Sequence, residues 1–365
     1  MAKTRLVDEE CAVLSIAEAK QVLKKIIAKA IKTGKCATVE IEGSPGIGKS
    51  QIVSAAATEL GVKETDIRLG HFGDSSEMVM KIPNVEHTSI HEIVLTRFPR
   101  EPNNVIRLDE FRHAAEDVRR GCYQLLQDFC LGPYTVPPGT TMIAISNGTA
   151  DVMTEELDDA LMDRFKHRMR VVADFKDWAD YIATKNYKHG ATVCAFLKCN
   201  QSSFILKPEG GHLLMTPRRW ESVIEDLDEM DMVKTIMPPA TYIVFNQFVT
   251  KVELFRDVDQ LISGKRDMPE DIGDQWAVYA AIMSHLTTDA KYEDKCFEVF
   301  EEKMRGMDSD IQCNTQLDVI RFYLTKKKLS LPDVLIKLPA PKKAILSAVV
   351  KKYQFAASGL VQTTE

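Results

Sequence analysis

The 365-residue sequence lacks several familiar motifs. Its eight cysteines include no CxxC pair, and its eight histidines include no HExxH motif, so the usual zinc-site and metalloprotease spacings are excluded. No apolar run approaches the roughly 20 residues that span a bilayer. The first ten residues, MAKTRLVDEE, also lack the apolar core of a signal peptide. We therefore expect a cytoplasmic protein without a membrane span, whose cysteines are reduced and mostly buried.

The chain as a whole also lacks a strong basic charge. Its net charge is -6, which provides no global field for nucleic acid or anionic lipid. The exception is residues 326–365, where eight lysines outnumber Asp333 and Glu365 and give a local charge of about +6. This Lys-rich tail leaves nucleic-acid binding open, although a solvated helix face explains the same lysines.

The apolar pattern predicts alternating strands and helices over roughly residues 10–175. Ser15 and Glu18 form a capping box that begins a helix, and Gly34 ends it. A hairpin is expected within the insert around 82–98. Strands are expected at 37–41, 67–69, 105–108, 141–146 and 168–172. This alternation is typical of a parallel α/β sheet, and the chain after about residue 177 is mostly helical.

A glycine-rich loop follows the first of the long expected strands. The segment GSPGIGKS fits the pattern G-x-x-x-x-G-K-[ST], in which backbone N–H groups surround a pyrophosphate at a helix N-terminus. Its lysine can reach the β- and γ-phosphates, and its last serine can ligate Mg²⁺. We therefore predict a site for ATP and Mg²⁺ whose binding residues are Gly43, Ser44, Pro45, Gly46, Ile47, Gly48, Lys49, Ser50 and Gln51.

Polar residues end two further expected strands. The segment VIRLDE ends in Asp109, a second candidate ligand of Mg²⁺ beside Ser50, and in Glu110, which can polarise the attacking water. Asn147 ends the strand TMIAISN and can orient that water, although a turn-forming Asn before a glycine is an equally good explanation. Arg107 is unusual inside a strand, and an exposed strand end would explain it.

Two arginines are candidates for the positive charge that phosphoryl transfer requires. Arg164 lies at an expected helix end in ALMDRF, and Arg218 lies at an expected helix start in TPRRW. A lone arginine at either position is usually a surface salt bridge, so neither motif identifies a function by itself.

Taken in order, these elements resemble the AAA+ ATPase superfamily and, more narrowly, the MoxR family, over about residues 10–325. The segments that carry the resemblance are LDEFRHA, LLQDFCLGPYTVPPGTTMIAISN, LDDALMDRFKHRMRV and TPRRWESV. The segment KIPNVEHTSIHEIVLTRFP occupies the position of that family's helix-2 insert. Two positions depart from the family pattern: Arg112 replaces an asparagine after the acid pair, and Gly148 replaces a proline after Asn147.

The resemblance implies an α/β P-loop core over residues 1–175, with a parallel five-stranded sheet between helices. An all-α lid over 176–300 and a helical C-terminal extension over 301–365, which carries the Lys-rich tail, would follow. The resemblance also implies roles for single residues. The catalytic residues would be Glu110, Asn147 as sensor 1, Arg164 as the arginine finger with Arg168 as its alternative, and Arg218 as sensor 2 with Arg219 as its alternative.

By the same resemblance, the protein would be a Mg²⁺-dependent ATPase that works as a ring, usually a hexamer. It would remodel or activate a partner protein, typically together with a protein that carries a von Willebrand factor A domain. A nucleic-acid motor or helicase loader is the alternative, which the Lys-rich tail favours. A scaffold that binds ATP without hydrolysing it is a third possibility, and the presence of Glu110 argues against it.

Overall fold

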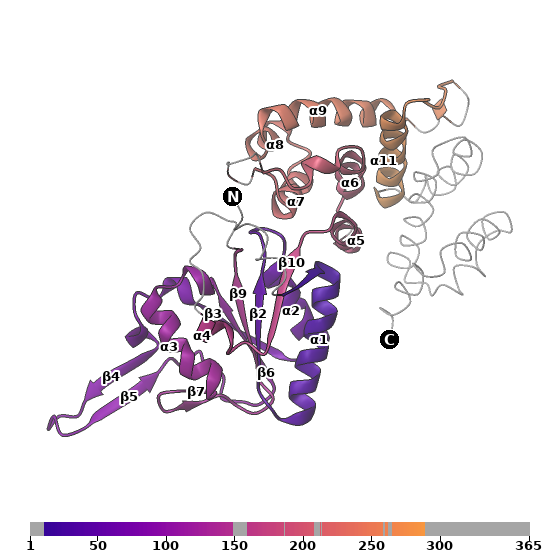
Figure 1. Cartoon of the computed structure of the whole chain (residues 1–365). Helices are drawn as coiled ribbons and strands as arrows, with labels where there is room; N and C mark the ends of the chain where they lie inside the picture. Colours follow the sequence, from indigo (N-terminus) through magenta and orange to yellow (C-terminus); the bar gives the residue numbers. More distant parts are fainter. Residues whose placement is uncertain are drawn as a thin grey trace, which may run out of the picture. The chain divides into compact units, whose positions relative to one another are not determined.

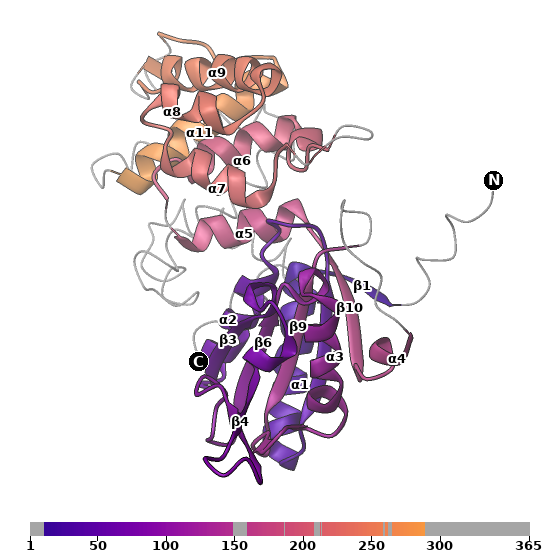
Figure 2. The same ribbon diagram turned by 90° about the vertical axis from the view of Figure 1, so that its left-hand side faces the viewer.

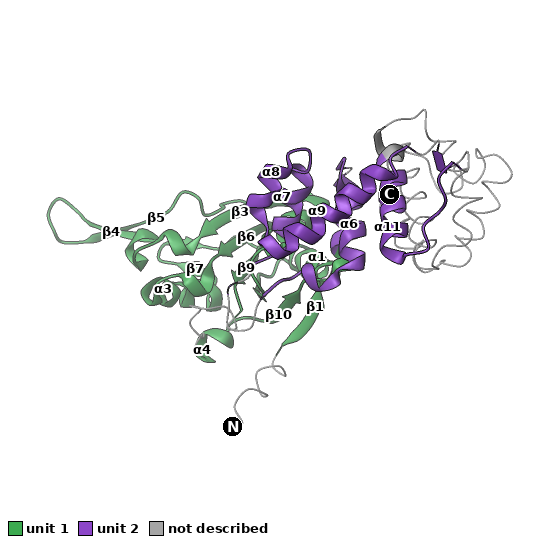
Figure 3. Cartoon of the chain, turned by 90° about the horizontal axis from the view of Figure 1, so that it is seen from above, with its two compact units in different colours: residues 1–177 green, residues 178–365 purple. Residues whose placement is uncertain are grey.

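The computed structural model describes residues 11–288, except 149–158, 186, 208–211, 213, 258–259 and 262–264. The chain divides into two compact units, residues 1–177 and 178–365, which Figure 3 shows in separate colours. The expected extension over 301–365 and its Lys-rich tail lie outside the described residues. Within the described part, no helix combines the length and the apolarity needed to cross a lipid bilayer.

The first unit is built on a six-stranded parallel sheet with the order β1-β10-β2-β9-β6-β3. The strands are β1 (Ala12–Ser15), β2 (Ala37–Glu42), β3 (Lys63–Arg68), β6 (Asn104–Asp109), β9 (Thr141–Ser146) and β10 (His167–Val172). The predicted parallel α/β fold is confirmed, but the sheet has one strand more than the five expected. The extra strand, β1, is four residues long and pairs with β10 at the sheet edge, and so short a segment carries too little alternation to be recognised.

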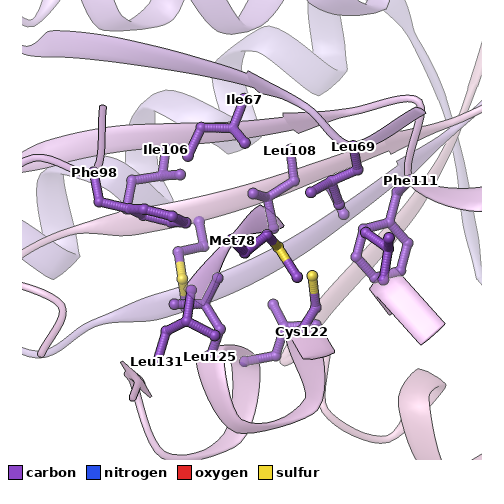
Figure 4. Close-up of a cluster of buried hydrophobic side chains, with 14 of the residues drawn as sticks. Ile67, Leu69, Met78, Phe98, Ile106, Leu108, Phe111, Cys122, Leu125 and Leu131 are labelled. Carbon is purple, nitrogen blue, oxygen red and sulfur yellow. The ribbon is translucent and has the colours of Figure 1, made fainter. Parts of the chain in front are cut away.

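Helices cover both faces of this sheet (Figure 1). Helices α1 (Ile16–Thr33) and α2 (Lys49–Glu59) pack with β2, β9 and β10 in one hydrophobic cluster. Helix α3 (Glu116–Gln127) packs with β3, β6 and β9 in a second cluster, shown in Figure 4. The predicted capping box is present, because the Ser15 side chain accepts from the Glu18 backbone N–H and Glu18 accepts from that of Ser15.

Two antiparallel hairpins and four short helical elements complete the first unit. Strands β4 (Val79–Pro83) and β5 (Ile90–Val94) form a ribbon that extends away from the sheet in Figure 1, which confirms the hairpin expected in the insert. Strands β7 (Cys130–Leu131) and β8 (Tyr134–Thr135) form the hairpin that leads into β9. The short helices are η1 (Leu69–His71), η2 (Ser75–Glu77), η3 (Phe111–His113) and α4 (Asp159–Met162).

The regular elements in the described part of the second unit are helices, and an isolated antiparallel bridge joins Leu206 to Met215. Figure 2 shows these helices gathered in one bundle. Four aromatic side chains pack together in its core: Phe196, Trp220, Phe245 and Phe248. The helices are α6 (Gly190–Cys199), η4 (Gln201–Ser203), α7 (Pro217–Glu225), α8 (Met230–Ile236), α9 (Pro239–Leu254) and α11 (Ile272–Thr288), while α5 (Phe175–Lys185) spans the boundary between the units.

The cysteines are less buried than expected. Six are described, and all six are free thiols. Only Cys122 is fully buried, and its burial raises the pKa of the thiol to about 12. Cys199 is exposed, and the other four are partly buried. Cys122 packs in the core beside β6 and therefore stays protonated at neutral pH.

Candidate nucleotide-binding site

The glycine-rich loop joins β2 to α2, as predicted. Gly46 and Gly48 have φ angles of 76° and 106°, in the left-handed region that glycine adopts without strain. Gly43 is required for a different reason, since a Cβ there would lie 2.4 Å from the carbonyl oxygen of Val171 on β10. The Gly43 N–H also donates to the Ser146 carbonyl at the end of β9. The loop is therefore held against the ends of two strands.

The lysine of the loop reaches the end of β9. Lys49 is 7% exposed, and its Nζ donates to the carbonyl oxygens of Gly43, at 2.6 Å, and Ser44, at 2.8 Å. The same Nζ donates to Asn147 Oδ1 at 3.0 Å. The structure therefore brings together the lysine and the asparagine that the sequence places 98 residues apart.

The serine of the loop meets the acid at the end of β6. Ser50 Oγ donates to Asp109 Oδ2 at 3.1 Å. Mg²⁺ prefers oxygen ligands and is usually held by one or two protein groups, with water and substrate phosphates filling the other positions. A hydroxyl and a carboxylate side by side at the start of α2 fit that requirement, so the two residues predicted as Mg²⁺ ligands have compatible geometry.

Glu110 has an unusual backbone conformation. Its φ and ψ angles are 59° and 34°, a left-handed conformation that costs a non-glycine residue about 1–2 kcal/mol. Its N–H donates to Asp109 Oδ1 at 3.0 Å, and its carbonyl accepts from the N–H groups of His113 and Ala114. These bonds hold the backbone of the turn, and the Glu110 side chain is exposed.

Arg107 is not at an exposed strand end, and that explanation of it is wrong. Its side chain is 12% exposed, because β6 lies between β9 and β3. The guanidinium pairs with Glu64 and Asp66 of β3, and its Nε lies 3.6 Å from Asp109 Oδ2. Its Nη1 also donates to Ser54 of α2 at 3.0 Å. Arg107 therefore ties the Asp109 carboxylate to the strand and helix on either side of it.

Sequence reasoning missed a buried ion-pair network on β2. Arg112 Nη2 donates to Glu40 Oε1 at 2.9 Å and to Glu42 Oε2 at 3.0 Å, and all three side chains are nearly inaccessible. Arg168 Nε donates to the other oxygen of Glu40, and Arg170 donates to the other oxygen of Glu42. Two acids two residues apart share one face of a strand, and this was the available signal. Arg168, the alternative finger, is engaged inside this network.

Arg164 lies at the opposite end of the sheet from the loop. It precedes β10, and its carbonyl accepts a hydrogen bond from Thr38 Oγ1 at 2.9 Å near the start of β2. Its guanidinium is 4.6 Å from the centre of the Tyr123 ring and donates to the Ala160 carbonyl. The structure therefore does not bring Arg164 to the glycine-rich loop of the same chain.

Arg218 and Arg219 are exposed in the first turn of α7, in the second unit. Thr216 caps this helix by accepting from the Arg219 N–H, and Pro217 occupies the first turn, so the predicted helix start is present. The Arg219 side chain donates to the Leu214 carbonyl.

Residues 39–172 match the family model described as "ATPase family associated with various cellular activities (AAA)". The chain contains an AAA ATPase domain. The matched AAA region runs from β2 to the end of β10 and includes the glycine-rich loop, the acid pair, Asn147 and Arg164. None of the curated proteins matches the chain by sequence.

Solved structures resemble the chain at low identity. A RuvB mutant of Thermotoga maritima is 16% identical with a TM-score of 0.41, over 79% of this chain and 90% of that one. The RuvB Holliday junction branch migration motor of the same organism is 17% identical with a TM-score of 0.37, over 79% and 89%. A protein of Cytophaga hutchinsonii assigned as a candidate ATPase is 14% identical with a TM-score of 0.34, over 86% and 88%. These scores are below 0.5 and carry no functional argument.

Proposed function

We propose that this chain is a MoxR-type AAA+ ATPase that hydrolyses ATP with Mg²⁺ and uses the energy to remodel or activate a partner protein. The observation that carries the proposal is the convergence of Lys49, Ser50, Asp109 and Asn147 at the carboxyl ends of β2, β6 and β9. These groups supply a cation, a hydroxyl, a carboxylate and an amide around one helix N-terminus, the combination that a triphosphate and a divalent cation require.

Each side chain has a separate part in this mechanism. Lys49 would exchange its loop carbonyls for phosphate oxygens, and Ser50 and Asp109 would hold Mg²⁺. The ion, when bound, neutralises charge that develops on the phosphate oxygens. Glu110 accepts a proton from the attacking water, and Asn147 orients that water. In this proposal Arg218, with Arg219 as the alternative, senses the nucleotide from the lid.

The position of Arg164 supports a site shared between subunits. Its backbone is tied to the amino end of β2, whereas the loop lies at the carboxyl end of the same strand. The guanidinium therefore suits the loop of a neighbouring copy better than its own. We propose a ring, with six subunits as the expected number, in which each Arg164 completes the next subunit's site.

The β4–β5 hairpin supports a protein as the partner. Met80, Ile90 and Ile93 are each more than half exposed, and Val85 at the tip is 98% exposed. The strands carry one lysine, Lys81, whose Nζ lies 3.7 Å from Glu92. Exposed apolar side chains of this kind mark protein contacts, whereas nucleic acid requires unpaired positive charge. A von Willebrand factor A domain protein is the partner expected from the MoxR resemblance.

The test is a pull-down with Glu110→Gln in the presence of ATP and Mg²⁺. We expect the variant to bind ATP, to lose turnover and to retain a von Willebrand factor A domain protein. The control is Lys49→Ala, which should retain no partner because it binds no nucleotide. Turnover that is stimulated by DNA and falls steeply with salt would instead support the nucleic-acid motor and contradict the proposal. Unchanged turnover in Glu110→Gln would exclude Glu110 as the water-polarising residue.

A further inference from the structure

The side chain of Glu110 occupies the space where a side chain of Gly70 would be. Gly70 lies in η1, the turn that follows β3. A Cβ at this position would lie 2.5 Å from Glu110 Oε2, 3.3 Å from Glu110 Cβ and 3.5 Å from Glu110 Cδ. The three atoms closest to that point therefore all belong to the catalytic acid. We propose that Gly70 is a positioning residue for ATP hydrolysis, which rests on the proposed role of Glu110.

Neither backbone can move away to make room. Leu69 precedes Gly70 and Phe111 follows Glu110, and both are fully buried in the same hydrophobic cluster. Figure 4 shows the labelled side chains of Leu69 and Phe111 toward the same end of that cluster. Moving either turn would expose one of these two buried side chains to water, which is unfavourable. The left-handed backbone of Glu110 is fixed further by the bond from its N–H to Asp109 Oδ1.

Glycine is required at position 70 because a larger side chain would collide with Glu110. The φ angle of Gly70 lies outside the left-handed region, so an L-residue can adopt its backbone conformation without strain. The atom nearest to an added methyl group is the terminal oxygen of a flexible side chain. Gly70→Ala should therefore displace the Glu110 carboxylate and leave the fold intact, which makes it a specific probe of where the carboxylate must sit.

We expect Gly70→Ala to lower kcat for ATP hydrolysis at least tenfold, because a misplacement of about 1 Å can cost a reaction roughly 100-fold. The KM and the affinity for ATP should stay within twofold of the parent values. The Tm should stay within a few degrees of that of the parent protein. A purely structural role would lower the Tm and change nucleotide binding together with kcat. Steady-state kinetics, nucleotide titration and thermal unfolding separate the two cases.

Gly73→Ala is the matched control. Gly73 lies three residues further along, also outside the left-handed region, and a Cβ there would lie 3.0 Å from Glu77 Oε1. The control therefore crowds the Glu77 carboxylate, which lies in the same segment but has no part in the proposed chemistry. We expect its kcat to stay within twofold of the parent value.

A second variant tests whether crowding is the cause. Glu110→Asp shortens the acid by one methylene and frees space beside Gly70, so Gly70→Ala should cost at most twofold in kcat on that background. An equal loss on both backgrounds, or an unchanged kcat in Gly70→Ala itself, would overturn the proposal while leaving the role of Glu110 intact. Full turnover in Glu110→Gln would overturn both.

Discussion

The two ends of the parallel sheet differ in what they present. At the carboxyl ends of β2, β6 and β9, charged and polar side chains point to one another around the loop. Near the amino end of β10, the guanidinium of Arg164 lies against the Tyr123 ring. Thr38 donates to the Arg164 carbonyl, and Glu42 lies just before the loop. The length of strand between these two residues is about 13 Å. One chain therefore carries both halves of the proposed chemistry but keeps them apart.

The strand that joins the two ends is itself charged. β2 is buried along its whole length and yet carries Glu40 and Glu42, whose carboxylates are satisfied by arginines from η3 and β10. Buried ion pairs contribute little net stability but cost several kcal/mol when one partner is removed. The comparison therefore suggests variants that disrupt the carboxyl end, the amino end or the connection between them.

The largest effect is expected at the carboxyl end. Lys49→Ala removes the cation that we propose binds the phosphates, and a charged hydrogen bond is worth about 1.5–3 kcal/mol for each phosphate oxygen contacted. We expect ATP affinity to fall at least 100-fold and turnover to become undetectable, as measured by nucleotide titration and phosphate release. Lys20→Ala is the control, since Lys20 pairs with Glu59 on the helix surface. Tight ATP binding by Lys49→Ala would contradict the assignment of the loop.

The next effect is expected at the amino end. Arg164→Ala should bind ATP normally but lose about 1,000-fold in kcat, the usual contribution of an arginine finger. Mixing it with inactive Glu110→Gln should restore part of the activity, because in the proposed ring some sites would combine Glu110 from one subunit with Arg164 from the next. Phosphate release across a range of mixing ratios measures this. No recovery at any ratio would argue that Arg164 does not act in a neighbour's site.

A smaller effect is expected in the connection between the ends. Arg112→Met leaves Glu40 and Glu42 with one arginine each from β10, so we expect a loss of about 3 kcal/mol in the free energy of unfolding. Urea unfolding measures the loss. Arg120→Met removes an exposed pair with Glu116 and should cost under about 1 kcal/mol. Equal stability of the two variants would mean that the buried network contributes no more than a surface pair.

The smallest effect is expected where β2 meets Arg164. Thr38→Val removes a hydroxyl that donates to the Arg164 carbonyl and accepts from the Lys166 N–H, which should cost about 1 kcal/mol. Thr141→Val is the control, because no described group bonds the equally buried Thr141 hydroxyl. We expect that change to be neutral or slightly stabilising in urea unfolding. A Thr38→Val variant as stable as the control would show that this contact does not fix Arg164.

The sequence was sufficient to predict the site residues whose location depends only on their position along a strand. A residue that ends a parallel strand lies at the carboxyl edge wherever the strand stands in the sheet, so Asp109 and Asn147 could be placed beside the glycine-rich loop in advance. Pairing across the sheet is different. Arg112 pairs with Glu40 and Glu42 from 72 and 70 residues away, and the spacing of the two acids does not indicate which arginine pairs with them.

The glycine beside Glu110, the proposed catalytic acid, was missed for a related reason. Gly70 has an ordinary backbone, so nothing in its own sequence context distinguishes it from a loop glycine. Its importance appears only when η1 and η3 are brought together by the core beneath them.

The separation of Arg164 from the loop also makes the expected turnover depend on protein concentration. If Arg164 serves a neighbour as proposed, a dilute solution of this protein contains intact, folded and nucleotide-competent chains that hydrolyse almost nothing. Specific activity would then rise with total protein concentration and level off as subunits associate. Abundance in the cell would therefore regulate the enzyme, with no need for a separate inhibitor.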